Sequence, residues 1–144
     1  MNPIFLQKLS YKLRLFSPLA KTLTYLIRLI FSCYIPYQVK IGKNFVLGYG
    51  GLGVVIHSRV KIGDDCHINQ NVTLGGTSKK NGGPKLGNHV YVGAGAAILG
   101  PITIGDNVVI GANAVVIKDI PSGSLVVGVP GKIIKSNIVK SDYV

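Results

Sequence analysis

Three histidines are the residues of this sequence best suited to move a proton near neutral pH. His57 ends the glycine-rich stretch YGGLGVVIH, His67 ends IGDDCH, and His89 lies in LGNHVY. An imidazole titrates close to pH 7, so it can act as a general base towards a hydroxyl or an amine. We expect His57 to be this base, because the inserted glycines before it can bring a substrate close. His67, oriented by Asn69 or Asp65, is the second candidate, whereas turn geometry is the better explanation for His89.

The same side chains do not predict a metal site. No two of the three histidines are closely spaced, whereas zinc needs ligands that converge at about 2 Å from the ion. Cys33 and Cys66 form no CxxC pair, and two thiols make no disulfide framework for 144 residues. We therefore expect reduced thiols in a cytoplasmic protein that carries no metal.

The elements that must position the histidines follow from a six-residue repeat. Each unit starts with Ile, Leu or Val and continues with turn-forming and polar residues. There are nine units: IGKNFV at 41, IHSRVK at 56, IGDDCH at 62, INQNVT at 68, LGNHVY at 86, VGAGAA at 92, ILGPIT at 98, IGDNVV at 104 and IGANAV at 110. Because each unit supplies a turn and a short strand, three units close one triangular coil with the first residues facing its axis. The sequence therefore predicts an all-β solenoid.

Two interruptions of the repeat predict loops. The stretch LGYGGLGVV, between Leu47 and Ile56, carries three extra residues, and LGGTSKKNGGPK after Thr73 is a polar, glycine-rich insert. Insertions in a solenoid become loops on one face, where function tends to gather. We expect the second insert to form a lid over an acceptor or a cofactor, with Gly75, Gly76 and Thr77 binding substrate and Tyr49 of the first insert donating a hydrogen bond to it.

The first part of the chain has a helical period instead. In residues 4–32, Leu, Ile and Phe recur every three or four positions opposite Lys and Arg, and Pro18 is expected to break the helix with Ser17 outside it. Such a helix suits either packing on its own protein or peripheral contact with an anionic membrane. The predicted segments are an amphipathic helical segment at 1–38, a solenoid with a C-terminal cap at 39–135 and a basic tail at 136–144.

The charge is strongly positive. Sixteen Lys and Arg face five acidic residues, which gives +11, and the first acid is Asp64. Such a field attracts anionic membranes, phosphorylated ligands or nucleic acid. The early cations are mixed with Leu, Ile and Phe rather than placed on a nucleic-acid module, so we expect no nucleic-acid partner. The expected place is the cytoplasm, with the inner face of the membrane as a candidate contact.

The repeat and the motifs VYVGAGAAILGPITIGDNVVIGANAVV, KDIP and VVGVPGKII resemble those of the hexapeptide-repeat acyltransferases. Within that family the chain is similar to serine O-acetyltransferases and to shorter acetyltransferases of surface-polysaccharide pathways. The resemblance covers about two thirds of the chain and implies a left-handed parallel β-helix that assembles as a homotrimer. It also implies an active site between adjacent subunits, with acetyl-CoA as co-substrate and a histidine as general base.

The resemblance also carries individual positions over. It implies that the small residues Gly93, Ala94, Ala112 and Ala114 border acetyl-CoA, and Lys118 and Lys132 can meet its phosphates. Serine acetyltransferases have one catalytic histidine where this chain has Tyr49 or Gly50. They have a second in the loop before a proline, where this chain reads KKNGGPK. Because both places lack a histidine, His57 is the expected substitute.

The function expected from these features is acetyl transfer from acetyl-CoA to a hydroxyl of a sugar or saccharide intermediate in surface polysaccharide biosynthesis. The acceptor is expected to be a small or lipid-linked sugar. Two alternatives stay open: a serine O-acetyltransferase, and a trimeric β-helix that binds sugar or acts as a scaffold without catalysis.

Overall fold

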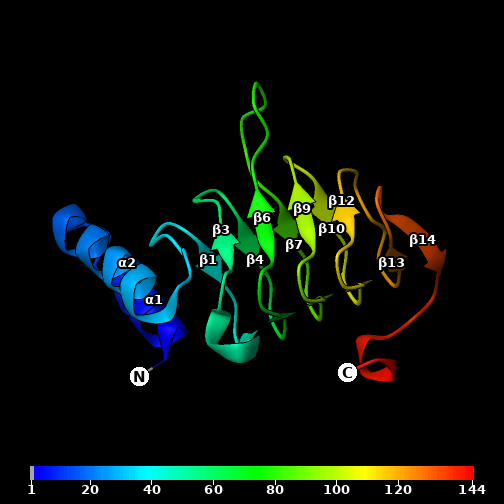
Figure 1. Ribbon diagram of the computed structural model, residues 1–144, viewed down its shortest axis with the longest axis horizontal. Helices are drawn as coiled ribbons and strands as arrows, with labels where there is room; N and C mark the ends of the chain where they lie inside the picture. Colours follow the sequence, from blue (N-terminus) through cyan, green and yellow to red (C-terminus); the bar gives the residue numbers. More distant parts are fainter. Residues whose placement is uncertain (1) are drawn as a thin grey trace.

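A computed structural model describes residues 2–144, and most of these residues form a three-sided parallel β-solenoid of about four turns (Figure 1). Met1, the first residue of the predicted 1–38 segment, lies outside the described residues. The fold class predicted from the sequence, a left-handed parallel β-helix with a short helical segment before it, agrees with this architecture. The parallel strands are β1 (Lys40–Ile41), β2 (Val46–Leu47), β3 (Val55–Ile56), β4 (Lys61–Ile62), β5 (His67–Ile68), β6 (Thr73–Gly75), β7 (Lys85–Leu86), β8 (Tyr91–Val92), β9 (Ala97–Leu99), β10 (Thr103–Ile104), β11 (Val109–Ile110), β12 (Val115–Val116) and β13 (Leu125–Val127).

The strands stack into three faces, which we name after their first strands. The β1 face has the order β1-β4-β7-β10, the β3 face has the order β12-β9-β6-β3, and the β2 face contains β2, β5, β8, β11, β13 and the antiparallel β14 (Lys132–Lys135). The register confirms the six-residue repeat, because Leu86 pairs with Ile104, 18 residues or three units later. Ile41 pairs with Ile62 and Ile62 with Leu86, so these coils hold 21 and 24 residues, and the surplus forms the two predicted loops.

The first residue of each repeat faces the axis of the solenoid and forms its core. On the β3 face, Ile56, Leu74, Ile98 and Val116 lie in register and are essentially inaccessible to solvent. Burying one such aliphatic side chain contributes roughly 1.5–3 kcal/mol. Corners between faces are closed by residues with positive φ, most of them Gly or Asn, which tolerate this backbone region.

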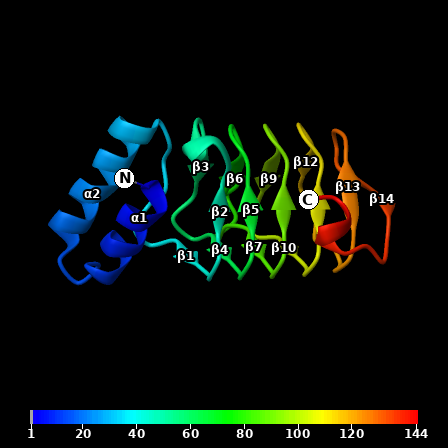
Figure 2. The same cartoon turned by 90° about the horizontal axis from the view of Figure 1, so that it is seen from below.

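Two helices cover the N-terminal end of the solenoid (Figure 2): α1 (Pro3–Lys12) and α2 (Ser17–Phe31). Pro18 does separate them, but the expectation that Ser17 is non-helical is wrong, since α2 begins at Ser17. Proline in the first helical turn needs no N–H partner, so the break falls before it, at residues 13–16. Ile4, Leu6 and Ile27 join the solenoid core, and the buried Gln7 amide donates to the Val39 carbonyl at 2.9 Å. Within residues 2–144, no helix is long and apolar enough to cross a membrane.

The opposite end is capped by the β13–β14 hairpin, as Figure 1 shows. The predicted basic tail, 136–144, packs back on the solenoid: Ile138 is buried, and the Lys140 ammonium donates to the Asp65 carbonyl at 2.8 Å. A short 3-10 helix, η2 (Lys140–Asp142), ends this segment.

Candidate functional site

His57 lies at the corner where the β3 face turns into the β1 face. We call this the loop corner; it contains the turns 57–60, 76–84, 100–102 and 117–119. The backbone holds His57 firmly, because its N–H donates to the Leu74 carbonyl at 2.8 Å and its carbonyl accepts from Val60 at 3.0 Å. The second predicted insert, residues 76–84, leaves the solenoid at this corner and projects away from it between β6 and β7 (Figure 1).

The imidazole of His57 packs against both ends of the projecting loop. A Cβ atom on Gly83 would lie 3.3 Å from its Nδ1, and one on Gly76 would lie 3.5 Å from its Nε2. His57 therefore fills the space into which a side chain at residue 83, directly before Pro84, would extend. The resemblance places a catalytic histidine in this loop before the proline, and here an imidazole reaches the same region from the preceding coil.

One hydrogen bond decides which nitrogen of His57 carries the proton. The backbone N–H of Arg59 donates to Nδ1 at 3.2 Å, so Nδ1 is the acceptor and the neutral ring carries its proton on Nε2. Nε2 as placed is a hydrogen-bond donor. Acting as a base through Nε2 requires the other tautomer and the loss of this hydrogen bond, which contributes roughly 0.5–1.5 kcal/mol.

His67, the second predicted base, lies on a different face. It points outward from β5 on the β2 face, and its ring packs edge-on against Tyr91 with a centroid distance of 5.2 Å. Burial, followed by the nearby Lys140 ammonium, lowers the pKa of His67 from its usual 6.5. The structure does not bring His67 to the loop corner of the same subunit. His89 adopts a left-handed turn conformation with φ of 55°, as turn geometry predicts.

Tyr49 and the small residues predicted to border acetyl-CoA gather at another corner. We call this the glycine corner; it joins the β2 and β3 faces through residues 48–54, 69–72, 93–96 and 111–114. Tyr49 belongs to the 3-10 segment η1 (Gly48–Gly51), has φ of 50°, and is 79% exposed. Gly93, Ala94, Ala112 and Ala114 stack there in two successive coils; Ala112 is exposed and Ala114 is buried.

Most of the remaining predicted residues lie at the loop corner. Gly75 ends β6, and Gly76 and Thr77 begin the projecting loop at the loop corner, where Gly76 lies beside His57. Lys118 is exposed at the same corner two coils further on, and Lys132 is exposed in the C-terminal hairpin. Within one subunit, the β3 face therefore separates the His57 group from Tyr49 and from the small residues predicted to border acetyl-CoA.

Several residues that shape the loop corner do not stand out in the sequence. Arg59 sets the His57 tautomer through its backbone, and Gly83 makes room for the ring. The only sequence signal for Gly83 is its place before Pro84 at the end of the insert. In residues 2–144 no group of three or more His, Cys, Asp or Glu side chains could hold a metal ion.

Comparison with known proteins gives consistent matches. The model for the bacterial transferase hexapeptide (six repeats) matches residues 83–118. The serine acetyltransferase of Helicobacter pylori is 49% identical over 123 residues, covering 84% of this chain and 71% of the relative. That of Synechococcus elongatus is 44% identical over 124 residues, covering 85% and 50%.

A solved structure agrees with these matches. The crystal structure of serine acetyltransferase in complex with coenzyme A from Brucella abortus strain S19 has a TM-score of 0.88 and 34% identity, covering 92% of this chain and 54% of that one. The chain spans about half the length of the Synechococcus and Brucella proteins. With its repeat, its solenoid and these relatives, the chain belongs to the serine acetyltransferase-like hexapeptide-repeat acyltransferases.

Proposed function

We propose that the protein is an acetyl-CoA-dependent O-acetyltransferase and that transfer takes place at the loop corner. The observation that carries this proposal is the imidazole of His57, wedged between Gly76 and Gly83 at the base of the projecting loop. It is a proton-transferring group in the region where the resemblance puts a catalytic histidine. Family membership supports the reaction class, and the coenzyme A in the Brucella structure supports the donor.

The proposed reaction is direct. The acceptor hydroxyl oxygen attacks the thioester carbon while His57 removes the hydroxyl proton, backbone N–H groups stabilise the oxyanion, and the carbon–sulfur bond breaks. The departing thiolate then takes the proton from His57, which leaves free coenzyme A and the acetyl ester. The tautomer change costs about 1 kcal/mol because the Arg59 hydrogen bond is lost. General base catalysis contributes 10²–10⁴-fold, or about 3–5 kcal/mol, so the base role is favoured despite this cost.

Serine is the acceptor that the names of the relatives favour over the sugar expected from the sequence. One observation favours the sugar as a second candidate. The segments 48–60 and 74–85, which include Tyr49 and His57, contain no acidic residue. The ammonium group of serine would therefore find no carboxylate partner on these segments, whereas a neutral hydroxyl compound needs none.

A homotrimer is proposed to complete the site. The outer side of the β3 face presents Val55, Thr73, Ala97 and Val115 in register, an apolar and small-residue strip between the two corners. Packing this strip against a neighbouring subunit would bury it and bring a loop corner towards a glycine corner. Acetyl-CoA would then run along the small residues from Gly93 to Ala114, whose side chains leave the backbone approachable.

Membrane contact through residues 4–32 also remains a proposal. The inner side of the two helices packs on the solenoid, as expected for a helical segment that docks on its own protein. Leu15 and Phe16 in the turn between the helices, and Leu29 of α2, are largely exposed among Lys and Arg. An apolar surface with cations suits an anionic bilayer. Sedimentation with vesicles of phosphatidylglycerol, and with phosphatidylcholine vesicles as control, tests this contact; equal binding to both or to neither contradicts it.

The central test measures free thiol released from acetyl-CoA by the purified protein. The acceptors are L-serine and, separately, methyl glycosides, and mass spectrometry identifies the acetylated product. We expect thiol release that depends on the acceptor. No release above hydrolysis with either class would contradict acetyl transfer and favour the non-catalytic scaffold.

A further inference from the structure

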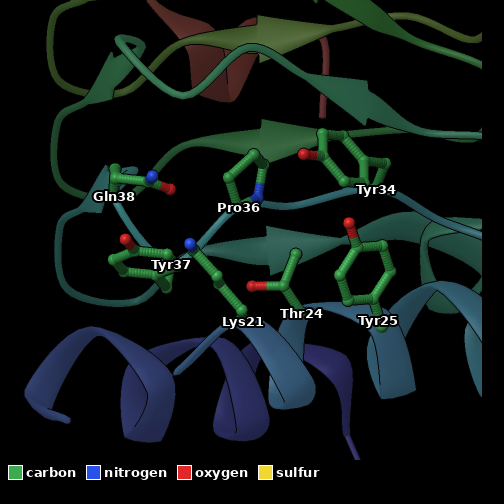
Figure 3. A pocket seen from close by; sticks show the side chains of 7 residues that line it. All are labelled: Lys21, Thr24, Tyr25, Tyr34, Pro36, Tyr37 and Gln38. Atoms are coloured by element: carbon green, nitrogen blue, oxygen red, sulfur yellow. The ribbon is translucent and has the colours of Figure 1, made fainter. Parts of the chain in front are cut away.

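A small pocket opens between α2 and the segment that leads into β1. Figure 3 shows its lining: Lys21, Thr24 and Tyr25 rise from the helix towards Tyr34, Pro36, Tyr37 and Gln38. Its volume is about 160 Å³. This space suits one ring-sized polar ligand and is below the 300–1,000 Å³ of pockets for drug-sized molecules.

The register of the solenoid places this pocket next to the loop corner. Tyr34 pairs with Val55, and its carbonyl accepts from the Ile56 N–H at 2.8 Å. Lys40 pairs with Lys61 in the same two coils. Pro36, Tyr37 and Gln38 therefore lie one coil before the turn that carries His57 and Arg59. Neighbouring strands of a sheet are about 4.8 Å apart, so the pocket begins one strand spacing from that turn.

The lining has the chemistry that recognises a sugar. Three phenol rings offer flat apolar surfaces, while their hydroxyls, the Gln38 amide and the Lys21 ammonium offer donors and acceptors at the edges. Within residues 2–144, the hydroxyls of Tyr25, Tyr34 and Tyr37 have no hydrogen-bond partner, whereas Thr24 donates to the Ala20 carbonyl. Tyrosine also supplies a large contact area at low cost in conformational entropy. No acidic residue lines the pocket, so a cationic ligand is disfavoured.

We propose that this pocket is a carbohydrate subsite that holds one sugar ring beside the place of acetyl transfer. The proposal rests on the proposed function and narrows it. A saccharide longer than one unit would keep one ring among the tyrosines and present a hydroxyl of the next unit towards His57. Serine is too short to use both places, so the subsite separates saccharides from serine as acceptors.

Binding is tested on the full-length protein by saturation-transfer difference NMR. The probes are the methyl glycosides of glucose, galactose, mannose and N-acetylglucosamine. The variants are Tyr25→Ala, whose ring is exposed enough to be removed without disturbing the core, and Tyr25→Ala combined with Tyr37→Ala. Tyr143→Ala is the matched control, because Tyr143 is also accessible but lies at the C-terminal end of the chain. Near-ultraviolet circular dichroism and the thermal midpoint check folding.

We expect at least one glycoside to bind saturably, Tyr25→Ala to weaken it about tenfold, and the double variant to abolish it. Tyr143→Ala should bind as the unaltered protein does. In the transfer assay, Tyr25→Ala should raise the KM for a disaccharide glycoside and leave the KM for serine unchanged.

The outcomes separate this proposal from the proposed function. If no glycoside binds saturably, or if the folded tyrosine variants bind as tightly as the control, the subsite is refuted even where serine is acetylated. If glycosides bind and the tyrosine variants lose them while no acceptor is acetylated, the subsite stands and the proposed acetyl transfer falls.

Discussion

The role of His57 can be tested by replacing it with Gln, Asn and Ala. The Gln amide nitrogen can reach the place of Nε2 and donate a hydrogen bond there, but it cannot take up a proton near neutral pH. The shorter Asn places its amide near Nδ1 instead, where it can still meet the Arg59 N–H through its oxygen. The three variants therefore separate donation at Nε2 from proton removal.

The magnitude follows from the hydrogen bond at Nδ1. Retaining the proton on Nε2 is favoured by about 1 kcal/mol, so roughly one ring in six has the tautomer that a base needs. This reduces the base contribution only several-fold, whereas losing the base costs 10²–10⁴-fold. We therefore expect kcat to fall by about 10²–10⁴-fold in all three variants, with His57→Gln as inactive as His57→Ala.

The assay follows free thiol from acetyl-CoA at saturating acceptor, with the hydrolysis rate subtracted. Thermal unfolding of each variant controls for stability, and a midpoint close to that of the unaltered protein qualifies the variant. If His57→Gln keeps kcat within about tenfold while His57→Asn loses it, His57 donates a hydrogen bond to the thioester and is not the base. That result would refute the proposed proton transfer.

Other properties of the structure lead to four further expectations. Ala97→Lys, on the outer side of the β3 face, should break the trimer in light scattering, while Thr103→Lys on the cationic β1 face should not. Ile98→Ala should lower the free energy of unfolding in urea by about 2–5 kcal/mol, since Ile98 is fully buried. Because the pKa of His67 is lowered in the folded state, the unfolded state binds more protons below pH 6.5, so stability should fall as the pH drops from there, and less so in His67→Asn. Burial raises the pKa of Cys33 to about 11, so a thiol reagent at pH 8 should label it only after unfolding; rapid labelling of the folded protein would contradict this.

Much of the fold was predictable from the repeat, because few folds can bury an aliphatic side chain at every sixth position. The surplus of three residues before Ile56 and the insert after Leu74 appear where the repeat is interrupted. The prediction that Ser17 lies outside the helix was wrong, because proline is tolerated in a first helical turn. No sequence pattern predicts the packing of the tail through Ile138, because this packing depends on the solenoid surface already being formed.

The candidate site, like the fold, was predictable only in part. The sequence by itself determined that this is a solenoid with a histidine directly after its first loop, because both follow from residue spacing along the chain. Only the tertiary structure decided which residues meet. In the structure His57 packs against Gly76 and Gly83, and its Nδ1 accepts a hydrogen bond from the Arg59 N–H. His67 lies on another face. Contacts between coils join residues about 20 positions apart, and their geometry depends on how two loops fold over one corner, which spacing alone does not encode.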